Sequence, residues 1–228
     1  MPTGFPKYVL SSVMAFCLVS LWGCSKNPTA LQEPQAASIA TFTDIDGNVY
    51  HGITLGTQVW SVEGLKTTRL NDGTAIPLVA DSAAWINLKT PGYCWYKDSV
   101  SYGYAYGALY NWYAVNTGKL APAGWHVPTE TEWNIVRLYL GRGSVTAGPI
   151  NPVYPNNVSI ACFPPLLGGH RDTSGIFSLV RYYGSWWSST ASDTTHSWSH
   201  DMYFGNTNVS GHSSGNNAGL SIRCVRDN

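Results

Sequence analysis

The most informative pattern of hydrophobic and polar positions lies at residues 129–141 and has helical spacing. One face of the predicted helix would carry Trp133, Val136 and Leu140, at positions i, i+3 and i+7. Just before this face, Thr129 and Glu132 stand at the spacing of a capping box, in which each side chain pairs with the other residue's backbone N–H. Gly141 suits the left-handed residue that follows a helix end. The pattern therefore predicts a helix over about residues 130–140.

A second, shorter helix is predicted over residues 107–115. This run holds Ala, Leu, Tyr and Trp after its first glycine and contains no further helix breaker. Residues 116–118, Asn-Thr-Gly, would end it.

The remaining patterns are those of short strands. Asp46-Gly47 is typical of a hairpin turn, here between strands at residues 41–43 and 49–55. The same turn has part of the spacing of a calcium loop, but its glycine is misplaced and the required glutamate is missing. Polar and larger residues alternate over 197–204, and apolar residues alternate over 220–224. We expect an α+β domain in which two short helices pack on short twisted antiparallel sheets joined by long loops.

The N-terminal residues have the pattern of a targeting segment. An apolar run at residues 8–21 follows Lys7 and is too short for a spanning helix. It ends in Leu-Trp-Gly-Cys24, which resembles a bacterial lipobox in which Cys24 is acylated. We therefore expect a lipoprotein signal peptide over 1–23, a flexible tether over 24–40 and one domain over 41–228. Plain secretion and an uncleaved anchor are the alternatives. The partner of acylated Cys24 would be outer-membrane lipid, on either the periplasmic or the surface face.

Composition narrows the class of partner. Charged residues are 11% of the chain and the net charge is zero, whereas about 25% is usual. Nucleic acid is not expected as a partner because there is no basic stripe to displace phosphate counterions.

Residues 184–219 contain no Lys, Arg or Glu and are rich in Ser, Asn, Gly and aromatic residues. Aromatic side chains supply contact area at low entropic cost, and small polar residues supply adaptable hydrogen bonds. Core packing and a solvated loop are the alternatives for these residues. We expect this segment to bind a polysaccharide or a surface protein. Its candidate ligand-binding residues are Trp187, Trp198, His200, Tyr203, Asn206, Asn208 and His212.

Several ordered motifs resemble those of the Fibrobacter succinogenes major paralogous domain family. The longest are Y-G-A-L-Y-N-W-Y-A-V at 106–115 and P-A-G-W-H-V-P-T at 122–129, followed by Glu132 and Trp133. Other matching motifs lie at 46–50, 56–60, 92–96, 169–171, 186–190 and 222–227. The resemblance covers about residues 41–227. It implies a C-type-lectin-like fold, related to that of the formylglycine-generating enzyme.

The cysteines depart from the family pattern at one position. Ala121 stands where the family usually has a cysteine, so the pairing that the resemblance implies for that position with the last strand cannot form. If Cys17 is removed with the signal peptide and Cys24 is acylated, then Cys94, Cys162 and Cys224 remain in an oxidising compartment. Three cysteines allow three pairings, of which Cys162–Cys224 is the one we favour.

No catalytic, metal or cofactor site is predicted. The histidines form no H-E-x-x-H motif, and there is no G-x-S-x-G. The formylglycine-generating enzyme uses a close pair of active-site cysteines, and no such pair stands out here. The leading hypothesis is a lipid-anchored binding module of the cell envelope. The alternatives are a variable ligand-binding protein diversified by a retroelement, a structural envelope component and an enzyme without a recognisable motif.

Overall fold

The computed structural model describes residues 40–141, 166–205 and 208–226. The chain divides into two units, Met1–Ala36 and Ala37–Asn228, and all described residues belong to the second. Cys24, Cys162 and Asn206 lie outside the described residues, as do the signal peptide and nearly all of the tether.

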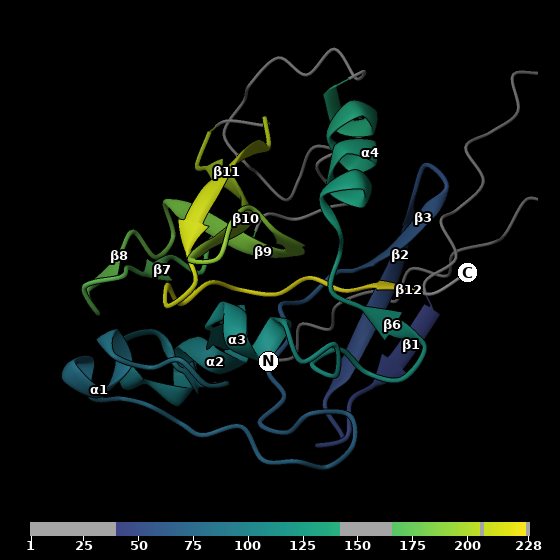
Figure 1. Ribbon diagram of the computed structural model, residues 1–228. Helices are drawn as coiled ribbons and strands as arrows, with labels where there is room; N and C mark the ends of the chain where they lie inside the picture. The colour runs from purple at the N-terminus through teal and green to yellow at the C-terminus, as the bar shows by residue number, and fades with distance from the viewer. Residues whose placement is uncertain (1–39, 142–165, 206–207, 227–228) are drawn as a thin grey trace, which may run out of the picture. The chain divides into compact units, whose positions relative to one another are not determined.

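The second unit is a mixed α+β fold (Figure 1). Its helices are α1 (Ser82–Ile86), α2 (Val100–Tyr106), α3 (Trp112–Val115) and α4 (Glu130–Gly141), with a short 3-10 helix, η1 (Tyr96–Asp98). The largest sheet has the order β1 (Ala40–Thr43), β2 (Val49–Leu55), β3 (Gln58–Ser61), β12 (Val225–Arg226) and β6 (Trp125–His126). A second sheet has the order β11 (Ser210–Gly215), β10 (His196–Tyr203) and β9 (Tyr183–Ala191). Two small sheets pair β4 (Tyr93–Cys94) with β5 (Leu109–Tyr110), and β7 (His170–Arg171) with β8 (Phe177–Ser178).

The predicted hairpin is confirmed. β1 and β2 pair antiparallel around Gly47, whose φ of 81° requires the left-handed region. The turn is held by Asp44, whose carboxylate accepts hydrogen bonds from the backbone N–H of Asp46 and Asn48 and from the Tyr50 hydroxyl. The Asp44 carboxylate is therefore the hydrogen-bond acceptor that closes the turn.

The predicted helix over 130–140 is confirmed as α4. The capping box forms as expected, because the Thr129 N–H donates to Glu132 Oε2 at 2.8 Å and the Glu132 N–H donates to Thr129 Oγ1 at 3.3 Å. Its apolar face packs into a core that also contains residues of β2, β3, β9 and β10, among them Leu55, Trp60, Trp186 and Met202.

The predicted helix over 107–115 is wrong in its first half. Gly107 has a φ of 88° and follows the end of α2, and Leu109 and Tyr110 form β5 against β4. Only α3 is helical, and the Asn111 side chain caps it by accepting from the Ala114 N–H at 3.1 Å. The preceding helix, α2, comes earlier than the pattern predicted.

Two arginines are fully buried within the fold. The Arg171 guanidinium donates to the carbonyls of Val79 and Ala80, each at 2.8 Å, and lies 4.7 Å from the ring centre of Trp85. Arg223 donates to the carbonyls of Ser61 and Val62. Each arginine therefore joins a late segment of the chain to an early one.

Candidate functional site

The sheet β11-β10-β9 carries most of the predicted ligand-binding residues, and it has two covered faces. In β10, Ser197, Ser199 and Asp201 point to one face, whereas Trp198, His200 and Met202 point to the other. Helix α4 contacts β9 and packs with Trp186 on one face, and α3 contacts β9 and packs with Trp187 on the other. The middle of the sheet is consequently buried on both faces.

Two predicted ligand-binding residues lie in this buried middle. Trp187 is fully buried, and its indole N–H donates to the Tyr110 carbonyl at 2.8 Å. His200 is also fully buried, with its ring stacked on Trp133 at 4.5 Å between ring centres. The expectation that these two side chains offer surface to a ligand is wrong, because both faces of the sheet are covered where they lie. Trp198 is half-buried.

The exposed predicted residues lie near one end of the sheet. Tyr203 is 54% exposed at the end of β10. Asn208 is exposed just before β11, and His212 is half-exposed within it. The structure thus leaves Tyr203, Asn208 and His212 at least partly exposed.

Two exposed aromatic residues beside Tyr203 were missed by the sequence analysis. Tyr182 is 65% exposed and Phe204 is 53% exposed. The Phe204 N–H donates to the Tyr182 carbonyl at 2.8 Å, and the two rings are 6.4 Å apart. The sequence signal is the pair Tyr182-Tyr183, which stands just before the segment 184–219. Tyr203 packs on Tyr183 and not on this pair, so it lies on the other face of the two strands. We call the three exposed rings at this end of the sheet, Tyr182, Tyr203 and Phe204, the aromatic surface.

A turn just before β9 places Tyr182 in this position. Leu179 and Arg181 both adopt positive φ, at 63° and 71°, although neither is glycine. Such a backbone persists only where the surrounding structure fixes it, and here the N–H groups of Tyr182 and Tyr183 both donate to the Leu179 carbonyl. The aromatic surface is therefore built on an ordered turn.

Polar groups lie next to the aromatic surface. Asp201 is buried, and its Oδ2 lies 2.8 Å from Nδ1 of His212. The hydrogen bond and negative charge of Asp201 raise the pKa of His212, and burial lowers the pKa of nearby His170. Tyr183 packs against Tyr203 with 4.7 Å between ring centres, and burial together with Asp201 raises the pKa of its hydroxyl. Asp201 Oδ1 is buried and has no hydrogen-bond partner.

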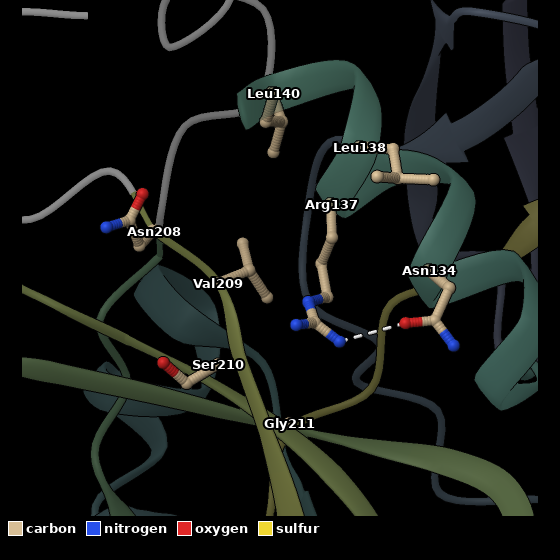
Figure 2. A pocket seen from close by; sticks show the side chains of 8 residues that line it. All are labelled: Asn134, Arg137, Leu138, Leu140, Asn208, Val209, Ser210 and Gly211. Carbon is tan, nitrogen blue, oxygen red and sulfur yellow. Dashed lines mark hydrogen bonds between the residues drawn. The ribbon is translucent and has the colours of Figure 1, made fainter. Parts of the chain in front are cut away.

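The structure also contains an open pocket on the other side of β11. It lies between α4 and the start of β11, has a volume of about 670 Å³ and is lined by Asn134, Arg137, Leu138, Leu140, Asn208, Val209, Ser210 and Gly211 (Figure 2). We call it the α4–β11 pocket. Asn208 belongs to its lining, so the pocket begins close to the exposed end of the sheet.

His126 lies beside a helix cap, and Cys94 and Cys224 lie in the core. His126 Nε2 lies 2.8 Å from Glu132 Oε1, beside the capping box of α4. Cys94 and Cys224 are buried, and burial raises the pKa of both thiols, that of Cys94 to about 12. Since Cys162 lies outside the described residues, its pairing with Cys224 stays a prediction.

Over residues 40–141, 166–205 and 208–226, no group of three or more His, Cys, Asp or Glu side chains could hold a metal ion. In the same ranges, no helix is long and apolar enough to cross a membrane.

The site belongs to a domain of a recognised family. The model of the Fibrobacter succinogenes major domain matches residues 53–226. The chain therefore belongs to the Fibrobacter succinogenes major domain family. Searches of curated proteins and of solved structures found no match.

Proposed function

We propose that this chain is a lipid-anchored binding module of the cell envelope that recognises a glycan through the exposed end of the sheet β11-β10-β9. The observation that carries the proposal is the exposure of three aromatic side chains, Tyr182, Tyr203 and Phe204, at one end of the sheet, with Asp201 and His212 on the face of Tyr203. Exposed apolar patches rimmed by polar groups are typical of binding sites.

The chemistry of this surface suits a sugar better than a protein partner. Aromatic rings pack against the apolar C–H faces of a pyranose, and hydroxyl groups need nearby donors and acceptors. Tyr203 would supply the apolar contact, and His212 and Asn208 the hydrogen bonds. The sheet itself is rigid, because its middle is buried on both faces, so little ordering would be required on binding.

Two features of the fold support a C-type-lectin-like classification, which we also propose. The last strand, β12, returns to the beginning of the domain and inserts between β3 and β6. The exposed, loop-rich end of β9 to β11 precedes this closing strand, where lectin-like domains often bind ligands.

The binding function is tested with a glycan array and a cell-wall pull-down, using residues 25–228. We expect retention of one polysaccharide class by the wild-type protein and its loss in Tyr203→Ala. Tyr104→Ala is the matched control, because Tyr104 is 77% exposed but belongs to α2. Failure of the wild-type protein to bind any polysaccharide or envelope fraction would overturn the proposal.

The anchoring of the module is a separate part of the proposal. Acylation of Cys24 would hold the domain at outer-membrane lipid, and residues 25–40 would act as the tether. Labelling with an alkyne fatty acid should mark the wild-type protein and Cys17→Ser, but not Cys24→Ser. Equal labelling of Cys24→Ser and the wild type would exclude Cys24 as the lipidated residue.

A further inference from the structure

A carboxylate and an imidazole share one face of the sheet with Tyr203. Asp201 and Tyr203 are two residues apart in β10 and therefore point to the same face. His212 of β11 lies opposite Ser199, which is two residues from Asp201 on the other side and points to that face too. Asp201 thus lies between Tyr203 and His212 on this face.

Asp201 fixes the orientation of the His212 ring. Its Oδ2 lies 2.8 Å from His212 Nδ1, and because a carboxylate only accepts hydrogen bonds, Nδ1 carries a proton. The Asp201 side chain is 8% exposed, whereas that of His212 is 40% exposed. Among the residues that the structure describes, none forms a hydrogen bond with His212 Nε2, and this atom is not buried. Nε2 is therefore the nitrogen of the ring that solvent reaches.

The pairing also favours the protonated form of the imidazole. The hydrogen bond and the negative charge of Asp201 raise the pKa of His212, against the opposing effect of burial. In the imidazolium both ring nitrogens carry protons, so Nε2 becomes a hydrogen-bond donor as well. Since Asp201 balances the positive charge from the buried side, Nε2–H is a charge-assisted donor at the surface.

Other titratable groups surround this pair. In the described part of the chain they are Tyr203 of β10, Tyr183 of β9, and His170 and Asp172 of and beside β7. Burial lowers the pKa of His170, so this second imidazole is neutral near pH 7 and does not compete for the charge of Asp201. Burial and Asp201 raise the pKa of Tyr183, so its hydroxyl keeps its proton. The negative charge of Asp201 therefore acts mainly on His212.

We propose that Asp201 is a positioning residue of the glycan-binding surface: it holds His212 as an imidazolium whose Nε2–H donates to a sugar oxygen, while the ring of Tyr203 packs against the sugar. This inference rests on the proposed glycan-binding function and adds its regulation by pH. A neutral His212 that keeps its proton on Nδ1 has only a lone pair on Nε2 and cannot donate there. Affinity should therefore be complete while His212 is protonated and fall as pH rises through its folded pKa.

Calorimetric titration at pH 6, 7, 8 and 9, with the oligosaccharide that the array retains as the probe, tests this inference. We expect the wild type to bind roughly tenfold more weakly at the highest pH than at the lowest, because the charge-assisted hydrogen bond is lost. Asp201→Asn keeps an oxygen that accepts from Nδ1 but removes the charge, so its affinity should fall at lower pH. The matched control is Asp193→Asn, since Asp193 lies 3.4 Å from Nδ1 of His196 in an exposed pair. It should follow the wild type.

A second variant keeps the test decisive if Asp201→Asn does not fold. His212→Gln changes a half-exposed side chain that has no charge to lose on either side of neutral pH, so its affinity should not depend on pH. The ¹⁵N spectrum of the free wild-type protein gives an independent readout, because the neutral His212 ring should carry its proton on Nδ1.

Two results would overturn the positioning role of Asp201 while leaving the glycan-binding function intact. One is the same dependence of affinity on pH in the wild type and His212→Gln. The other is a neutral wild-type ring that carries its proton on Nε2, since Asp201 would then not hold Nδ1. Absence of retention on the array at every pH would remove the glycan-binding function together with this inference.

Discussion

Trp187 and Tyr203 belong to the same sheet, yet the structure gives them opposite roles. Both are large aromatic residues in the uncharged segment, and the sequence analysis named both as ligand-binding residues. An alternating strand pattern separates two faces but does not say whether a neighbouring element covers each face. Here both faces are covered at Trp187, and the cover ends before Tyr203. The burial of Trp187 and His200 therefore could not be predicted from the local sequence.

The two residues should separate stability from binding. Trp187→Ala removes a fully buried indole and should lower the free energy of unfolding by about 3–5 kcal/mol. Tyr203→Ala removes a half-exposed ring that packs on Tyr183 and should lower it by only about 1 kcal/mol. Urea unfolding followed by tryptophan fluorescence measures both values. A large destabilisation by Tyr203→Ala would mean that Tyr203 is part of the core.

At the scale of elements, local signals predicted some parts of the fold and missed others. The hairpin turn at Gly47 and the capping box of α4 depend on residues a few positions apart, so the sequence revealed them. The run 107–115 was assigned as a helix because its residues tolerate one. β5 forms there instead because Tyr110 pairs with Tyr93, and this partner is distant in sequence.

Gly107 explains why the chain must leave the helix before β5. A Cβ at this position would lie 2.7 Å from the Leu65 carbonyl oxygen, and its φ of 88° disfavours other residues. Gly107→Ala should therefore destabilise the domain by about 2–4 kcal/mol, from strain and crowding together. Gly118→Ala is the control, because Gly118 has a φ of 67° but nothing within 4 Å of an added Cβ. Gly118→Ala should lower the free energy of unfolding by about 1 kcal/mol. Equal losses for Gly107→Ala and Gly118→Ala in urea unfolding would contradict the role of crowding.

For the whole domain, the buried and paired histidines predict how stability depends on pH. The lowered pKa values of His170 and His200 mean that their neutral forms stabilise the fold above about pH 6.5, the unfolded value. This contribution is lost as pH falls below that value. The raised pKa of His212 acts in the other direction. Its contribution is complete below about pH 6.5 and is lost as pH rises through the folded pKa.

His212→Gln should therefore remove part of the decline in stability as pH rises above about 6.5. It should leave the decline at lower pH in place, because His170 and His200 are still present. Urea unfolding at pH 5, 6, 7 and 8 measures how the free energy of unfolding changes on the acidic and on the alkaline side of about pH 6.5. If the free energy of unfolding of His212→Gln falls above about pH 6.5 as steeply as that of the wild type, the pair of His212 with Asp201 does not contribute to stability.

The central claim is that the exposed end of the sheet β11-β10-β9 is a glycan-binding surface. The most direct measurement is the affinity of the domain for the glycan selected on the array, compared among the wild type, Tyr203→Ala and Tyr104→Ala. We predict at least a tenfold loss for Tyr203→Ala, which corresponds to about 1.4 kcal/mol, and wild-type affinity for Tyr104→Ala. Equal affinities in all three proteins would contradict the claim.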